Sequence, residues 1–294
     1  MAVYSESWLQ LETASGGRVA LSGNASEMRQ QFAGLFADLS PNYPPATDVL
    51  SIIEGAHESI KYRVYIPKNT TPDKLLPIGI YTHGGGFLLG DLETEDFICR
   101  ELVEQTNTII VSVDYRLSPN HHYPAQLSDT IKILEWANSN ARSFGGDADQ
   151  FFTIGTSAGA SLALISAREI VSGRTSVNPE CLRGVVAISP FTAHPDYIPQ
   201  EYRSDYTSYD ELGDTAPVIS RAVMSKLFRC DPLRDDGQVF ASALREAGVT
   251  VRERIYQGLP HCLWFFSTLP EWAEFIHDTV AAIQFIVGTS KATK

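Results

Sequence analysis

A five-residue turn, Gly155-Thr156-Ser157-Ala158-Gly159, restricts the possible folds more than any other part of the sequence. It matches the pattern G-x-S-x-G, and it lies between a short apolar run and a helix-like segment of small residues, which is the context that a nucleophile elbow requires. Glycine is needed on both sides because the backbone of such a turn is crowded and strained. The pattern predicts that the Ser157 hydroxyl projects at a sheet edge as a nucleophile. The alternative is a glycine-rich turn in which the serine only caps the helix.

Short apolar runs alternate with helix-like segments along most of the chain. The predicted strands are residues 60–66, 76–81, 108–113, 151–154, 184–188 and 249–256, and the predicted helices are 94–105, 125–138, 159–171 and 239–247. This alternation predicts an α/β fold with a mostly parallel sheet and helices on both faces. Residues 191–216 interrupt the alternation as an insertion would, and helical signals before residue 41 indicate a separate N-terminal element.

Composition excludes several classes of function. The chain has 23 Lys and Arg against 35 Asp and Glu, a net charge of −12, so its surface repels phosphate backbones and no nucleic-acid partner is expected. The four cysteines form no C-x-x-C pair, so we expect neither a metal site nor a redox motif. The sequence has no secretory signal and no apolar run near the ~20 residues that span a bilayer, so we expect a cytoplasmic protein without a membrane span.

Three adjacent glycines follow the predicted strand 76–81, in His83-Gly84-Gly85-Gly86-Phe87. Backbone amides without side chains around them can point at a developing oxyanion. We expect amides of Gly84, Gly85 and Gly86, together with the amide of Ala158, to bind the charge that forms on a carbonyl oxygen. The alternatives are a flexible turn or a phosphate loop, but the glycine spacing does not fit G-x-G-x-x-G or a Walker loop.

A serine hydroxyl attacks a carbonyl well only when a base takes its proton and a carboxylate orients that base. Among the seven histidines, His261 follows the last predicted strand in a Gly258-Leu259-Pro260 loop, where it can lie over the sheet edge. A lone loop histidine is otherwise a solvated surface residue. The serine and the glycine run favour His261 as the base.

Three aspartates precede the predicted helix 239–247 and are candidates for the orienting acid. Asp235 and Asp236 fit the first turn of a helix, where carboxylates are favourable. Asp231 precedes a proline and is the better candidate. The resulting chain order, Ser157, Asp231, His261, is one of the known orders of a Ser-His-Asp triad.

Together these segments resemble the hormone-sensitive-lipase-like esterases of the α/β-hydrolase fold. The resemblance covers nearly the whole chain and rests on residues 83–86, 114–119, 123–125, 155–159, 231–237 and 258–261. It implies a cofactor-independent carboxylic-ester hydrolase that acts on a small-molecule ester with a small to medium apolar acyl group. Phe87 and Leu88 would line the substrate pocket. Residues 258–262 resemble a fungal branch that includes secondary-metabolite esterases.

The resemblance also implies a helical cap over the pocket. It divides the chain into N-terminal cap helices at 1–45, a hydrolase core at 46–190, a cap insertion at 191–228 and the rest of the core at 229–294. The sequence leaves open whether the protein forms a homodimer.

The sequence departs from the family pattern at two places. Thr156 stands where many relatives have Asp, which we treat as neutral. Only 74 residues separate Ser157 from Asp231, fewer than in the family, and a helix-like segment at 217–228 stands where a strand before the acid is expected. The sequence therefore leaves open whether the strand before the acid is missing. An inactive or ligand-binding homologue on the same fold remains an alternative, and so does dehydratase or acyl-transferase chemistry in the same pocket.

Overall fold

The computed structural model describes residues 4–68, 74–192, 198–208, 216–218 and 234–288. The chain forms two compact units, one of Met1–Tyr43 and Ser189–Phe275 (unit 1) and one of Pro44–Ile188 and Ile276–Lys294 (unit 2). The breaks fall close to residues 45 and 190, where the sequence placed domain boundaries. Residues 234–275 belong to unit 1, so the assignment of 229–294 to a hydrolase core stays a prediction.

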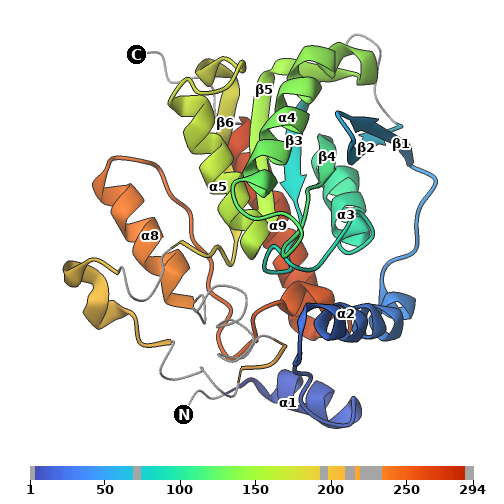
Figure 1. Ribbon diagram of the computed structural model, residues 1–294, viewed down its shortest axis with the longest axis vertical. Coiled ribbons are helices and arrows are strands. Elements are labelled where there is room, and N and C mark those ends of the chain that lie inside the picture. The colour runs from blue at the N-terminus through green and yellow to red at the C-terminus, as the bar shows by residue number, and fades with distance from the viewer. Residues whose placement is uncertain (1–3, 69–73, 193–197, 209–215, 219–233, 289–294) are drawn as a thin grey trace. The chain divides into compact units, whose positions relative to one another are not determined.

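In the described part of unit 2, six strands form one sheet in the order β1-β2-β4-β3-β5-β6 (Figure 1). The strands are β1 (Leu50–His57), β2 (Ile60–Pro67), β3 (Leu76–Thr82), β4 (Ile109–Asp114), β5 (Gly146–Thr156) and β6 (Leu182–Ile188). The pairs β1–β2 and β2–β4 are antiparallel, whereas β4, β3, β5 and β6 run parallel. The carboxyl ends of the parallel strands therefore meet at one edge, which is where such sheets place their sites.

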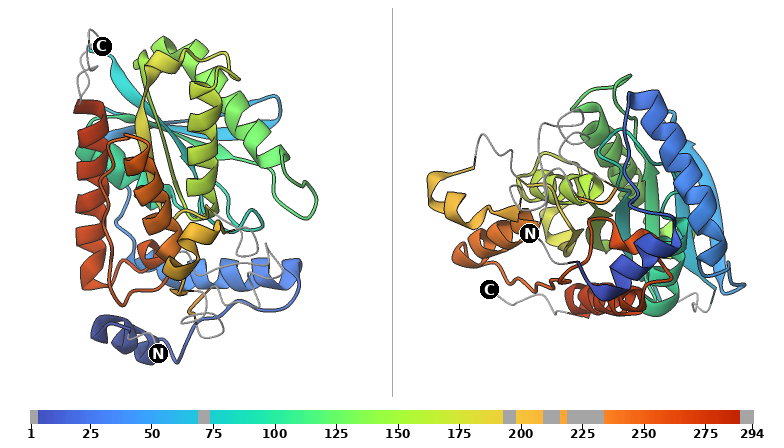
Figure 2. Two further views of the ribbon diagram at one scale, coloured as in Figure 1. Left: turned by 90° about the vertical axis from the view of Figure 1, so that its left-hand side faces the viewer. Right: turned by 90° about the horizontal axis from the view of Figure 1, so that it is seen from below.

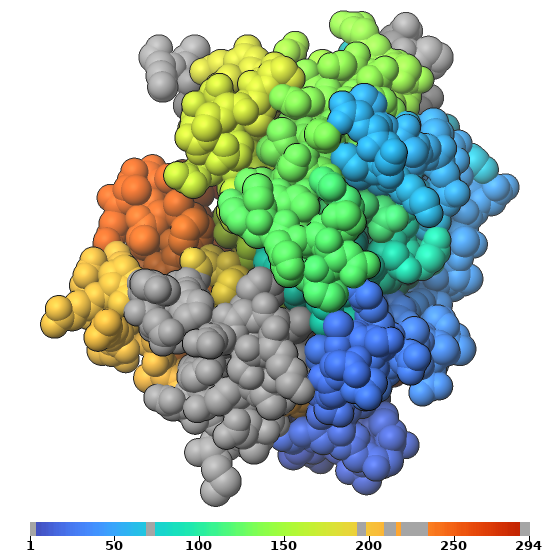
Figure 3. Space-filling model, in the orientation of Figure 1, coloured from blue at the N-terminus to red at the C-terminus, as the bar shows by residue number. Residues whose placement is uncertain are grey.

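Helices cover both faces of this sheet (Figure 2). On one face lie α4 (Ala125–Asn140) and α5 (Ala158–Val171), and on the other lie α3 (Asp96–Thr106) and the C-terminal part of α9 (Pro270–Gly288). Short 3₁₀ turns, η2 (Ala141–Phe144) and η3 (Pro179–Cys181), precede β5 and β6. The surface of α4 adjoins that of the β1–β2 hairpin (Figure 3).

Alternation along β2 assigns its side chains to the two faces. The Tyr62 ring lies 4.0 Å from the ring of Trp136 in α4, whereas the Tyr65 hydroxyl donates to Asp96 in α3 at 2.8 Å. The apolar core between the sheet and the pair α4–α5 is fully buried and includes Val64, Ile78, Ile80, Val111, Ile133 and Leu162. Burial of these aliphatic side chains is the main stabilising contribution to unit 2.

Unit 1 is built from helices and aromatic contacts. It contains α1 (Glu6–Ala14), α2 (Ala25–Leu39), η1 (Ser40–Asn42), η5 (Gln200–Asp205), α8 (Arg234–Glu246), η7 (Leu263–Phe265) and the first residues of α9. The Asn24 side chain and Glu27 form a capping box at the start of α2. Trp8 of α1 is 1% exposed and packs edge-on against Phe266 at 4.9 Å, so the N-terminal helices pack on the segment that follows His261.

The structure confirms the predicted α/β class and the strands and helices between residues 60 and 188. The predicted strand 249–256 is wrong, because this segment is not paired in the sheet. Val249 and Ile255 are exposed, and the charged residues between them pair with helices, for example Arg254 with Glu274. The helix-like residues 219–228 lie outside the described residues.

The sequence did not predict β1 or α9. Only the first residue of β1, Leu50, is buried, so the strand has no alternating apolar pattern. For α9, Pro270 at the first helical position was a usable signal. No helix in the described ranges is long and apolar enough to span a membrane.

Candidate active site

Ser157 occupies the turn between β5 and α5 with an unusual backbone conformation. Its φ is 50° and its ψ is −122°, values that a non-glycine residue rarely adopts and that cost on the order of 1–3 kcal/mol. The Ser157 amide donates to the carbonyl of Ile188 at 2.8 Å, and the side chain makes no capping hydrogen bond to α5. The helix-capping alternative is therefore wrong, and the strained turn is what a nucleophile elbow requires.

The two glycines of the elbow permit close backbone packing against β3. A Cβ atom on Gly159 would lie 2.0 Å from the carbonyl oxygen of Thr82, and one on Gly155 would lie 2.5 Å from the carbonyl carbon of Gly159. The Thr82 hydroxyl also donates to the Gly159 carbonyl at 2.7 Å. The elbow is thus in contact with Thr82, which lies two residues before the glycine run.

The glycine run turns sharply after β3. Gly85 and Gly86 have φ values of 115° and 61°, in the region that favours glycine, and Phe87 follows with 59°. A Cβ atom on Gly85 would lie 2.3 Å from the carbonyl oxygen of Leu89. The sequence placed Gly84, Gly85, Gly86 and Ala158 together, and the structure brings these backbone segments to the same end of the sheet.

His83 is buried next to the glycine run and contacts both Tyr115 and Gly84. Its ring stacks on Tyr115 with centroids 4.2 Å apart, and it is 1% exposed. Burial lowers the pKa of His83 to about 4, so the imidazole is neutral at pH 7. Nδ1, which we assign as the protonated nitrogen, then donates to the Gly84 carbonyl at 2.7 Å. The Tyr115 hydroxyl donates to the His83 carbonyl at 2.6 Å.

Thr156 has a partner far away in the sequence. Its hydroxyl lies 2.8 Å from both carboxylate oxygens of Glu95, and both residues are buried. The same carboxylate accepts from the Tyr81 hydroxyl at 2.7 Å and from the Gly84 amide at 3.3 Å. Glu95 lies in the first turn of the predicted helix 94–105, where a carboxylate is ordinary, so its role was not recognisable from local sequence.

His261 belongs to unit 1 and lies in the loop before η7. Its ring packs edge-on against Trp264 at 5.3 Å, and the next residue, Cys262, has a φ of 70°. Burial lowers the pKa of His261 to about 4, so it is neutral at pH 7 and has a ring nitrogen able to accept a proton.

Asp231 lies outside the described residues. Asp235 and Asp236 are in the first turn of α8, as predicted, and are 2% and 4% exposed. Asp235 accepts from the amides of residues 207 and 208, each at 2.6 Å, and Asp236 accepts from the Thr192 amide at 2.7 Å. These two carboxylates therefore bind backbone of the insertion.

The two residues expected to line a substrate pocket differ in their surroundings. Phe87 is partly buried and packs against the core of unit 2, whereas Leu88 is 4% exposed. Across the described ranges, no three His, Cys, Asp or Glu side chains come close enough to hold a metal ion.

A family model for the alpha/beta hydrolase fold matches residues 79–230, a stretch that contains both the glycine run and the elbow. The chain belongs to this family. It is 37% identical to a versiconal hemiacetal acetate esterase of Dothistroma septosporum over 98% of this chain and 96% of that protein. It is 31% identical to the protein of the same name from Aspergillus parasiticus, over 80% of this chain and 81% of that one.

A solved structure gives the same fold. The hyperthermophilic esterase of Pyrobaculum calidifontis matches with a TM-score of 0.80 at 24% identity, over 98% of this chain and 100% of that one. With the family match and the esterase relatives, this chain is a carboxylic-ester hydrolase of the hormone-sensitive-lipase-like group, in its fungal secondary-metabolite branch.

Proposed function

We propose that this esterase hydrolyses its substrate through an acyl-enzyme formed on Ser157. The observation that carries the proposal is the strained Ser157 backbone at the carboxyl end of a buried parallel strand, beside a run of glycine amides. His261 acts as general base and Asp231 as the acid that orients it. Neutral His261 at pH 7 suits the base, because only the neutral ring accepts the serine proton.

The reaction then has two halves. The Ser157 hydroxyl attacks the acyl carbon while His261 takes its proton, and the resulting imidazolium returns a proton to the leaving alcohol. Water, deprotonated by His261, hydrolyses the acyl-serine and regenerates the enzyme. Asp231 fixes the tautomer of His261 and stabilises the imidazolium.

Backbone amides stabilise the tetrahedral intermediates. The Gly84 amide already donates to Glu95, so the donors available to the oxyanion are those of Gly85, Gly86 and Ala158. Amides at the start of α5 also carry the positive end of the helix dipole. Removing one oxyanion donor in such a site costs about 100- to 1000-fold in kcat.

We propose esters with a short apolar acyl group as substrates, with Phe87 and Leu88 at the pocket. The versiconal hemiacetal acetate esterases are named for an acetate ester, which supports a short acyl group and a secondary-metabolite alcohol. Pockets for such substrates are mostly apolar with a few convergent polar groups.

The test replaces Ser157 with alanine and measures hydrolysis of p-nitrophenyl acetate and butyrate. We expect Ser157→Ala to lower kcat by at least about 10⁴-fold and to abolish labelling by a fluorophosphonate. Ser166→Ala, which replaces a buried serine inside α5, is the matched control and should keep activity and labelling. Activity retained in Ser157→Ala would exclude the mechanism. A wild-type protein that is neither labelled nor active would instead indicate a ligand-binding homologue.

A further inference from the structure

The Glu95 side chain is a buried acceptor between three segments of unit 2. It is 2% exposed and receives hydrogen bonds from the end of β3 (Tyr81), from the glycine run (Gly84) and from the residue before the nucleophile (Thr156). An ionised carboxylate has only acceptor sites, so it suits three donors better than any neutral side chain of its size. Burial and the negative charge of Glu95 raise the pKa of Tyr81 well above 10, which keeps the phenol protonated as a donor.

These bonds fix the peptide groups around Gly84. The Gly84 amide is held by Glu95, and the Gly84 carbonyl is held by Nδ1 of His83. The Gly84 carbonyl and the Gly85 N–H belong to one planar trans peptide group and point in opposite directions. Fixing the carbonyl therefore fixes the direction of the Gly85 N–H, the first of the proposed oxyanion donors.

The same carboxylate also fixes the other side of the proposed oxyanion hole. Thr156 is the last residue of β5, and two residues later Ala158 supplies the remaining donor. A Cβ atom on Gly84 would lie 2.9 Å from the Thr156 hydroxyl oxygen, so the glycine run and the elbow are in contact where Glu95 joins them. One side chain thus bonds to both segments that must be aligned.

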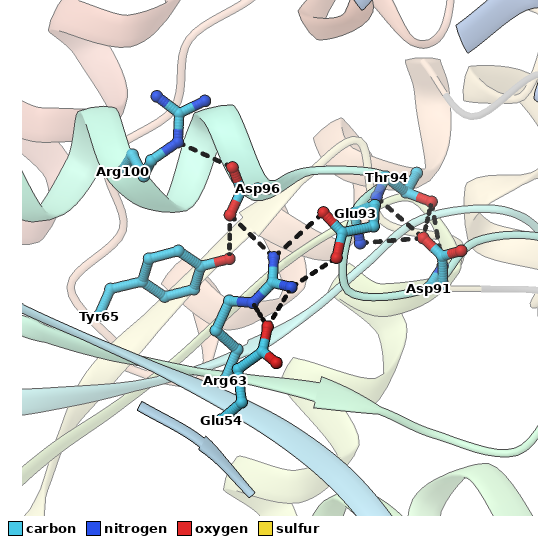
Figure 4. A network of polar contacts seen from close by, with 8 residues as sticks. All are labelled: Glu54, Arg63, Tyr65, Asp91, Glu93, Thr94, Asp96 and Arg100. Atoms are coloured by element: carbon cyan, nitrogen blue, oxygen red, sulfur yellow. Dashed lines mark hydrogen bonds and ion pairs between the residues drawn. The ribbon is translucent and has the colours of Figure 1, made fainter. Parts of the chain in front are cut away.

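Glu93 and Asp96, which flank position 95 in the sequence, both form ion pairs with Arg63 (Figure 4). Arg63 of β2 is 8% exposed, and its guanidinium donates to Glu93 and to Asp96, the latter at 3.0 Å. It also donates to Glu54 of β1 at 2.9 Å. Because Arg63 bonds to residues on both sides of Glu95, the backbone at position 95 is fixed to the sheet.

We infer that Glu95 is a positioning residue of the esterase, which holds the start of the glycine run against the elbow through its bonds to Gly84 and Thr156, while His83 fixes the Gly84 carbonyl. The inference rests on the proposed function of Ser157 and the glycine amides, and it goes beyond that function by assigning their alignment to one carboxylate. Thr156, which we treated as a neutral replacement of the Asp found in many relatives, is the elbow residue that bonds to Glu95.

The test uses Glu95→Gln, Thr156→Val, Thr156→Ser and the double variant Glu95→Gln/Thr156→Val. The glutamine keeps the shape of Glu95 but turns one acceptor into a donor, and the valine removes the hydroxyl. We expect Glu95→Gln and Thr156→Val each to lower kcat by about 10- to 100-fold. KM should change by less than about 3-fold, because the oxyanion donors are misaligned while the pocket is intact. Thr156→Ser restores the hydroxyl and should restore kcat to within about 3-fold of wild type.

The double variant tests whether both residues act through one bond. In that case its loss of kcat should be no larger than that of the worse single variant, within about 2-fold. Glu169→Gln, which removes a carboxylate from a surface ion pair with Arg174, is the control and should keep wild-type kcat. If Glu95→Gln does not fold, the comparison of Thr156→Val with Thr156→Ser decides.

Hydrogen–deuterium exchange separates this inference from the proposed function. Exchange of the peptide containing residues 83–88 should rise by at least about 10-fold in Glu95→Gln and stay unchanged in Glu169→Gln, whether or not the protein hydrolyses esters. Unchanged exchange, or multiplied losses in the double variant, would overturn the inference. Failure of Ser157 to react in wild-type protein, with exchange raised in Glu95→Gln, would overturn the proposed function alone.

Discussion

Replacing Gly159 with alanine is the most direct perturbation of the contact between the elbow and β3. The new Cβ would lie 2.0 Å from the Thr82 carbonyl oxygen and 2.4 Å from that of His83. Both are backbone atoms, and real Cβ contacts are essentially never shorter than 3.0 Å. The start of α5 or the end of β3 must therefore move by about 1 Å, since no rotamer change relieves the contact.

That displacement has two measurable consequences. Overpacking of this kind costs about 1–3 kcal/mol, so the midpoint of urea unfolding should fall. A 1 Å misplacement of reacting groups costs about 100-fold, so kcat for p-nitrophenyl butyrate should fall by about that factor. Both quantities are measured on the same purified Gly159→Ala protein.

Gly34→Ala provides the matched control for this substitution. Gly34 lies inside α2, and a Cβ there has no atom within 4 Å. Alanine is the better helix former, so this variant should gain about 0.5–1 kcal/mol and keep its kcat. Wild-type stability and kcat in Gly159→Ala would refute the close packing of elbow and strand described above.

Two further predictions concern stability. The folded pKa of His83, about 4, lies below its ordinary 6.5, so the unfolded state binds the proton first as pH falls. Through this residue, wild type should therefore lose about 2–3 kcal/mol of unfolding free energy between pH 7 and pH 4.5. In His83→Asn the loss should be smaller. Equal losses in the two proteins, measured by denaturant titration at both pH values, would contradict this. Trp8→Ala should cost about 3–5 kcal/mol. Trp8→Phe should cost much less, because the smaller ring leaves only a small cavity and the buried Trp8 Nε1 has no hydrogen-bond partner among the described residues. Equal losses in the two variants, measured by urea unfolding, would contradict this.

The parallel part of the fold was predictable because its strands are buried on both faces. Short continuous apolar runs at β3, β4 and β5 identify such strands without an alternating pattern. β1 was not predictable, since its place comes from pairing with β2 rather than from burial. The segment 249–256 has strand-like composition, but Val249 and Ile255 are exposed and do not pack in a core. Its charged residues instead form ion pairs with helices α8 and α9.

The backbone parts of the candidate site were predictable from glycine. At Gly155 and Gly159 the backbone lies so close to neighbouring backbone atoms that any Cβ would clash. Only glycine fits at these positions, so they can be recognised in the sequence. The Glu95–Thr156 contact spans 61 residues and uses residue types that are common at strand ends and helix starts. Nothing in the local sequence distinguishes these two residues from solvated ones, so only the fold reveals the pair.

Unit 1 joins the first 43 residues to residues 189–275, and this has a consequence for synthesis on the ribosome. Trp8 and Phe32 pack on Phe266 and Phe265, which are translated more than 200 residues later. The parallel strands between them can pair while the nascent chain is still growing. The N-terminal helices cannot bury their apolar faces until the segment after His261 has left the exit tunnel. Until then these faces stay exposed, where chaperones can bind them.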